Sequence, residues 1–422
     1  MASFEGAAEQ KIRQGSGVDV GERRVRVVSS VYAEQTVKGK ILYLVACSIR
    51  ADRRALDMIG SSKGLVSKSL TELKQAGLIN VTTGADRTVT LTAKGLSHIA
   101  RTAPDLHRYY MEYSNDNHPG GSRAHIEAFR KVSGALACMA QAGISIAIDK
   151  PSLQDITAGV SPKLDTDVAT FYLNKELRYE WDQKIIRGQQ SRSQGIVFSR
   201  GLRAQVYNMM KAKTITIPSK IERERNYRLI QTAKELYQSP TNVETTDSVL
   251  IAYDDKSALE MLRPPAGNAK RKTLSAAIWD RSLTRTDFRY IPMNEWGISL
   301  LHMLTNFSQE EILSACFTPT ERDQARKAKA GDGIIHRAPT DSEGLICYEF
   351  VSGNISKLAR IKRWYEGRFD QIGIVCTQAQ REFVLHFLNV SRLNIRTLPD
   401  NQISGQLKAM SERRDEDGLE KQ

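Results

Sequence analysis

The sequence predicts a mixed fold of the α+β or α/β class, in which a small N-terminal unit of helices and a hairpin precedes one or two α/β units. Two observations favour this class. Between residues 41 and 100, apolar residues first recur at helical spacing and then give way to two short runs rich in β-branched side chains. Beyond residue 170, apolar runs of strand length alternate with longer segments of helical pattern, as in βαβ units.

The third helix of the N-terminal unit carries the clearest functional pattern. It is predicted over residues 63–76, where apolar residues recur at spacings of three and four. Serines before it are natural N-caps, and Gly77 ends it. Its other faces carry small and basic residues, as a helix that enters a DNA major groove requires. We expect these residues to face DNA: Ser62, Lys63, Ser67, Lys68, Thr71 and Lys74.

Two β-rich runs follow, from Leu78 to Thr82 and from Thr88 to Thr92, and Arg87 closes the turn between them. Another helix is predicted directly afterwards. With this order of elements, the segments SSKGLVSKSLTELKQAGLI and TGADRTVTLTAKG resemble the winged-helix superfamily. The resemblance implies binding to double-stranded DNA, with Arg87 as a further contact. Because a winged helix can instead dock a protein, a protein-docking scaffold stays open as an alternative.

Length and charge narrow the class of protein. A chain of 422 residues predicts two or three domains, and a net charge of +13 favours a polyanionic partner. The five cysteines lack a paired spacing, which favours a reducing compartment over a structural zinc site. The sequence has neither a signal peptide nor an apolar run long enough to span a bilayer. We therefore expect a cytoplasmic protein without a membrane partner.

Five parts are predicted along the chain. Residues 1–30 form a flexible basic arm and residues 31–113 the winged-helix DNA-binding domain, which ends at a polar run with proline and glycine. Residues 122–305 form an α/β domain and residues 306–400 a second α/β unit. Both are expected to run hairpin, helix, strand, helix, strand, which indicates a structural duplication. Residues 401–422 are charged and poor in apolar residues, which predicts a disordered tail.

An acidic pair in the second α/β unit is the strongest candidate for catalysis. Asp332 and Glu349 are expected at facing positions of a hairpin. Restriction-type nucleases place an acid on one strand and Glu-x-Lys on the next, so that the carboxylates hold Mg²⁺ and the lysine orients water. Glu349 is followed by Phe and Val, so Lys357, or less plausibly Lys362, would have to reach back from the next helix. A Mg²⁺-dependent nuclease is therefore an alternative.

The segments GDGIIHRAPTDSEGLICYEFVSG and NISKLARIKRWYEG, with the order of elements, are similar to the plasmid replication-relaxation family of mobile elements. That family pairs a winged helix with a restriction-endonuclease-like domain. The resemblance implies DNA binding in plasmid replication, relaxation, transfer or their transcriptional control, alongside replication or transfer proteins or as a homodimer. We favour a non-enzymatic DNA-binding protein that needs no cofactor, with Mg²⁺ required only by the nuclease alternative.

Two further clusters carry charge. The helix from Ile355 to Gly367 is rich in cations, which could contact a DNA backbone while its apolar face packs in the core: Lys357, Arg360, Lys362 and Arg363. Glu176 and Arg178, with residues 191–195, could cradle a phosphate. An ordinary polar loop before a strand explains this second cluster more simply.

Overall fold

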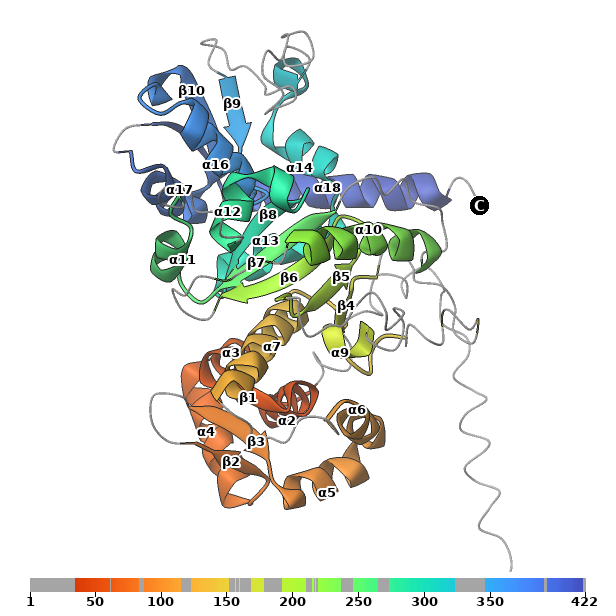
Figure 1. Ribbon diagram of the computed structural model, residues 1–422. Coiled ribbons are helices and arrows are strands. Elements are labelled where there is room, and N and C mark those ends of the chain that lie inside the picture. Colours follow the sequence, from red (N-terminus) through yellow and green to blue (C-terminus); the bar gives the residue numbers. More distant parts are fainter. Residues whose placement is uncertain are drawn as a thin grey trace, which may run out of the picture.

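The computed structural model shows a mixed α+β protein (Figure 1). The predicted arm at residues 1–30 lies outside the residues that the structure describes. The structure describes residues 35–60, 62–82, 87–114, 123–151, 168–177, 192–209, 219–236, 246–264, 273–322, 346–390 and 393–419, together with the single residues 156, 159, 215 and 217.

The N-terminal unit has the predicted order of helices and hairpin, with one strand added. That strand, β1, pairs with β3 in the antiparallel sheet β1-β3-β2. The sequence does not predict this strand, because its three residues, two of them charged, carry no strand pattern. The elements are α2 (Val37–Ser48), β1 (Arg50–Asp52), α3 (Arg53–Met58), α4 (Lys63–Gln75), β2 (Ile79–Val81), β3 (Thr88–Leu91), α5 (Ala93–Thr102) and α6 (Pro104–Ser114).

Helix α7 (Arg123–Gln141) lies between this unit and the central sheet (Figure 1). It was predicted as the first helix of the next domain, and it packs against α2, α3 and β1 as well as β6. Its buried Leu136 and Met139 belong to one hydrophobic core that continues from α2 to the central sheet. The first two units therefore share a core across the predicted boundary.

The central sheet has five strands in the described part of the chain, in the order β4-β5-β6-β7-β8. Strands β4, β5 and β6 are antiparallel, and β6, β7 and β8 are parallel. Alternate side chains point to opposite faces. On β6, Val206 lies in the core with α7, whereas Tyr207 lies in a second core with α12 and α16. The elements are β4 (Thr170–Leu173), α9 (Asn174–Leu177), β5 (Gly195–Phe198), β6 (Arg203–Met209), α10 (Ser219–Leu236), β7 (Asp247–Ala252), α11 (Asp255–Met261), α12 (Leu274–Trp279), β8 (Asp287–Pro292) and α13 (Glu295–Asn306).

A separate three-stranded sheet, β11-β10-β9, forms the C-terminal unit in the described residues, and all its pairings are parallel. The strand predicted to pair with β9 as a hairpin, at residues 333–336, lies outside the described residues. The elements from β9 to β11 run strand, α-helix, strand, α-helix, strand, and those from β6 to β8 differ from this order by a second α-helix, α12, before β8. The elements are α14 (Gln309–Cys316), β9 (Ile346–Glu349), α16 (Ile355–Trp364), β10 (Ile372–Thr377), α17 (Arg381–Leu388), β11 (Asn394–Leu398) and α18 (Asp400–Leu419).

Two local predictions are corrected. The apolar run at residues 144–148 predicts a strand, but there the structure has only an isolated parallel bridge between Ser145 and Thr170. The chain turns at residues 147–150, where Asp149 accepts hydrogen bonds from the amides of Ile146 (3.1 Å) and Ala147 (2.9 Å). The expected disordered tail contains α18, which contacts α14. Ile403 and Leu407 of α18 are buried and lie one helical turn apart, so they form an apolar stripe although the segment as a whole is poor in apolar residues. None of the described helices is both long and apolar enough to cross a membrane.

Candidate functional site

Helix α4 is fixed on one side by apolar packing and at its start by a cap. Val66, Leu70 and Leu73 are buried in the core of the N-terminal unit. The Ser62 hydroxyl accepts a hydrogen bond from the Leu65 amide at 3.2 Å, so the helix begins where the serine was predicted to cap it. The remaining faces of α4 are held toward solvent.

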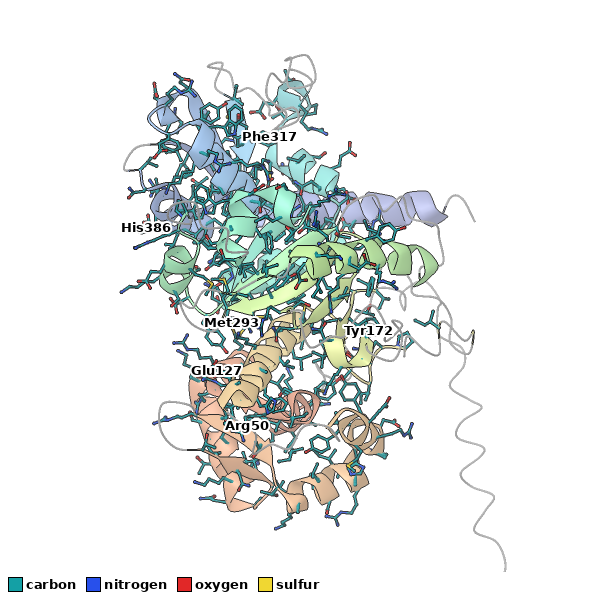
Figure 2. All side chains as sticks on the ribbon, viewed as in Figure 1. Arg50, Glu127, Tyr172, Met293, Phe317 and His386 are labelled. Carbon is teal, nitrogen blue, oxygen red and sulfur yellow. The ribbon has the colours of Figure 1, made fainter. Side chains whose placement is uncertain are left out.

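All seven residues predicted to face DNA are exposed. Six belong to α4 or its cap, and Arg87 directly precedes β3. Arg50 on β1, labelled in Figure 2, is instead buried and donates to the Thr88 hydroxyl at 3.2 Å. The exposed residues are Ser62, Lys63, Ser67, Lys68, Thr71, Lys74 and Arg87.

Two polar side chains on the flanks of α4 are engaged within the protein. The Ser67 hydroxyl donates to the Lys63 carbonyl at 2.9 Å and accepts from Nη2 of Arg53 at 2.7 Å. Glu72 lies 2.5 Å from Nζ of Lys38, and the hydrogen bond from this lysine lowers the pKa of the carboxyl. The acidic charge on α4 therefore faces a cation of α2.

A buried ion pair joins the N-terminal unit to α7. Nε of Arg130 donates to the Asp52 carboxylate, whose other oxygen caps α3 by accepting from the Arg54 amide at 2.8 Å. The Asp52 amide donates to the Ser133 hydroxyl at 3.0 Å. These contacts set the position of α3, the helix that precedes α4, relative to the central sheet.

Glu349 and Lys357 do meet, as the nuclease alternative requires. Nζ of Lys357 lies 3.5 Å from Oε2 of Glu349, while Asp332 lies outside the described residues. Burial raises the pKa of Glu349, but Lys357, the Ser352 amide and Arg289 more than compensate, so the pKa lies below its ordinary value. Gln309 also approaches the carboxylate, at 3.4 Å. With its side chain 1% exposed, Glu349 is arranged as a partner in a buried ion pair.

Most of the predicted cationic surface of α16 is turned to intramolecular partners. Arg360 donates to both oxygens of Asp287 at 3.0 and 3.2 Å. Lys362 donates to the Phe387 carbonyl at 2.6 Å, so it does not approach Glu349. Arg363 is exposed and keeps its side chain toward solvent. Leu358 and Ile361 are core residues as expected, whereas Trp364 is exposed.

The predicted phosphate cradle is also built differently in its described part. Glu176 is buried and pairs with Lys150 at 2.9 Å, and Ser193 is buried with its carbonyl accepting from Asn174. Arg178 and Ser191 lie outside the described residues. These contacts indicate a structural role for Glu176.

A buried polar network lies under α10 and was not predicted from the sequence. Gln205 donates to Asn226 (2.6 Å) and accepts from Arg225 (3.0 Å), and the Tyr207 hydroxyl donates to Glu222 (2.8 Å). Burial beside Glu222 raises the pKa of Tyr207 well above its ordinary value. A glutamine in an apolar strand, and polar residues on one face of the helix from residue 221, were the available signals.

Comparison with known proteins adds no relative: the chain matches no protein-family model, no curated protein and no solved structure. Within the described residues, no group of three or more His, Cys, Asp or Glu side chains is arranged to hold a metal ion.

Proposed function

We propose that this protein binds double-stranded DNA in a sequence-recognising manner, and that its N-terminal unit is a winged helix. The exposed face of α4 carries the proposal. Lys63 and Lys74 stand on a helix whose opposite side is fixed in a core, so they can meet phosphates without rearrangement of the fold. Arg87 adds a cation beside the hairpin, and the net charge of +13 favours the same partner.

The second part of the proposal concerns the biological process in which the protein acts. We infer a role in replication, relaxation, transfer or their transcriptional control on a plasmid or another mobile element, with a homodimer and replication or transfer proteins as further partners. The segments around β9 and α16 that resemble the replication-relaxation family support this setting. The role is non-enzymatic, because Glu349 and Lys357 pair with each other inside the fold and Gln309 also approaches Glu349, so a structural role accounts for both charged side chains.

Salt-dependent binding tests the proposal. In the double variant Lys63→Ala and Lys74→Ala, the slope of log affinity against log salt for a mixed-sequence duplex should fall by about two, since each phosphate contact releases about one counterion. The matched control is Lys220→Ala with Lys256→Ala, which removes the same charge from exposed positions on α10 and α11. Unchanged affinity and slope in a folded Lys63/Lys74 variant would favour the protein-docking alternative.

A second titration separates binding from cutting. We expect DNA binding to persist in EDTA and plasmid DNA to remain intact with Mg²⁺ or Mn²⁺, because the exposed face of α4 needs no metal. Metal-dependent nicking that disappears in Glu349→Ala while binding survives would instead support the nuclease alternative, with Asp332, Glu349 and Lys357 as its site.

A further inference from the structure

One ridge of α4 points directly away from the core. We propose that this ridge, formed by Gly64, Lys68, Thr71 and Gln75, reads base pairs in the major groove, with Gly64 as the point of closest approach. The inference rests on the proposed function and deepens it, because it separates residues that read sequence from those that only contact phosphates.

Helix geometry defines the ridge. Successive residues of an α-helix are rotated by about 100°. Val66, Ser69, Leu70 and Leu73 are buried, and their mean direction marks the inner side of α4. The four ridge residues are spaced by four, three and four positions, and their mean direction lies about 180° from that inner side. Each of them is exposed.

The side chains beside the ridge are less free to read bases. The Ser67 hydroxyl is held between the Lys63 carbonyl and the Arg53 guanidinium, and Arg53 is itself bound to Asp57 at 2.8 Å. On the other flank, Glu72 is paired with Lys38. Intramolecular contacts therefore restrict both flanks, while the ridge between them faces outward.

Gly64 is a glycine that the fold does not require. A Cβ atom built on it would meet one neighbour, the Ser62 hydroxyl oxygen at 4.0 Å, and its φ is not positive. By contrast, a Cβ on Gly95 would lie 2.1 Å from the Leu78 carbonyl oxygen. Alanine favours a helix over glycine. A glycine kept on the outward ridge instead permits close approach of an external surface, which here is the edge of the groove.

The other ridge residues carry side chains suited to base edges. The Lys68 ammonium can donate to O6 and N7 of guanine, and the Gln75 carboxamide can pair with N6 and N7 of adenine. The Thr71 hydroxyl donates to the Ser67 carbonyl at 3.0 Å, which leaves its methyl group for a thymine methyl. Gly64 and Gln75 are about 16 Å apart along the helix, so the ridge spans about five base pairs.

The test begins with selection of a preferred duplex from a random-sequence pool by the wild-type protein. Gly64→Ala should raise the melting temperature slightly and weaken binding to the selected duplex about tenfold, and Gly64→Leu should weaken it further. Gln75→Ala should reduce the preference for the selected over a scrambled duplex about fivefold or more, with little change on the scrambled one. Gly405→Ala is the matched control, because Gly405 is exposed on α18 with nothing within 4 Å of its Cβ position.

The outcomes distinguish this inference from the function on which it rests. If Gly64→Ala and Gln75→Ala keep full affinity and preference while Lys63→Ala with Lys74→Ala weakens all DNA binding, the ridge does not read bases and the proposed function stands. Wild-type protein that binds duplexes without enriching any sequence overturns the ridge and the sequence recognition in the proposed function, while DNA binding itself stands. Protein that binds no duplex at all overturns both.

Discussion

The ion pair between Asp52 and Arg130 gives the sharpest stability prediction, because it is buried and joins two parts of the fold. The side chains are 2% and 10% exposed. In Asp52→Asn the volume is kept and the amide oxygen can still cap the Arg54 amide, so the change replaces the charged acceptor of Arg130 by an uncharged NH2 group that cannot accept. Removing one partner of a buried pair costs about 3–5 kcal/mol, and we expect a loss in this range.

A matched control separates burial from charge. Asp57 pairs with Arg53 at 2.8 Å, one helical turn away, with side chains 21% and 30% exposed. Pairs of this kind stabilise a helix by about 0.2–0.5 kcal/mol, so Asp57→Asn should be nearly neutral. The measurement is urea unfolding at neutral pH with linear extrapolation.

A second substitution tests the cause of the loss. Arg130→Met added to Asp52→Asn removes the buried cation and keeps an extended side chain, so the double variant should recover most of the stability. The reasoning is refuted if Asp52→Asn costs no more than Asp57→Asn. It is also refuted if the double variant is less stable than Asp52→Asn alone.

Two further predictions concern the shared core and acid stability. Helix α7 adds Leu136 and Met139 to the core of the N-terminal unit. A fragment of residues 35–151 should therefore fold and bind DNA, whereas the backbone amides of a fragment of residues 35–113 should exchange faster with solvent. Equal protection of the amides from exchange in both fragments would contradict this prediction. The pKa of Glu349 lies below its ordinary 4.5, so its carboxylate stabilises the fold at neutral pH and this stabilisation is lost as the pH falls below that value. The free energy of unfolding should therefore fall less steeply with acidification in Glu349→Gln than in the wild type or in the exposed control Glu382→Gln, and equal slopes in all three would contradict the assignment.

The sequence by itself determined most of the local structure, because short-range patterns specify it. The spacing of Val66, Leu70 and Leu73, the serine cap before Lys63 and the glycine after the helix are all local signals, and they fix both the bounds of α4 and its exposed face. The apolar runs of strand length beyond residue 170 likewise predict strands, and β6, β7 and β10 are such runs. Where the pattern was too short or too sparse, as in β1 and α18, the prediction failed.

Only the tertiary structure decided which charged residues remain available for a partner. Arg360 and Asp287 are separated by 73 positions, and Arg130 and Asp52 by 78, yet each pair is joined by hydrogen bonds. On a linear chain, every lysine and arginine of α16 is an equal candidate for contact with DNA. The packing of α16 against β8 pairs Arg360 with a carboxylate, and its packing against α17 pairs Lys362 with a carbonyl, because cations brought into a fold need an acceptor there. On α4 the same residue types stay in solvent.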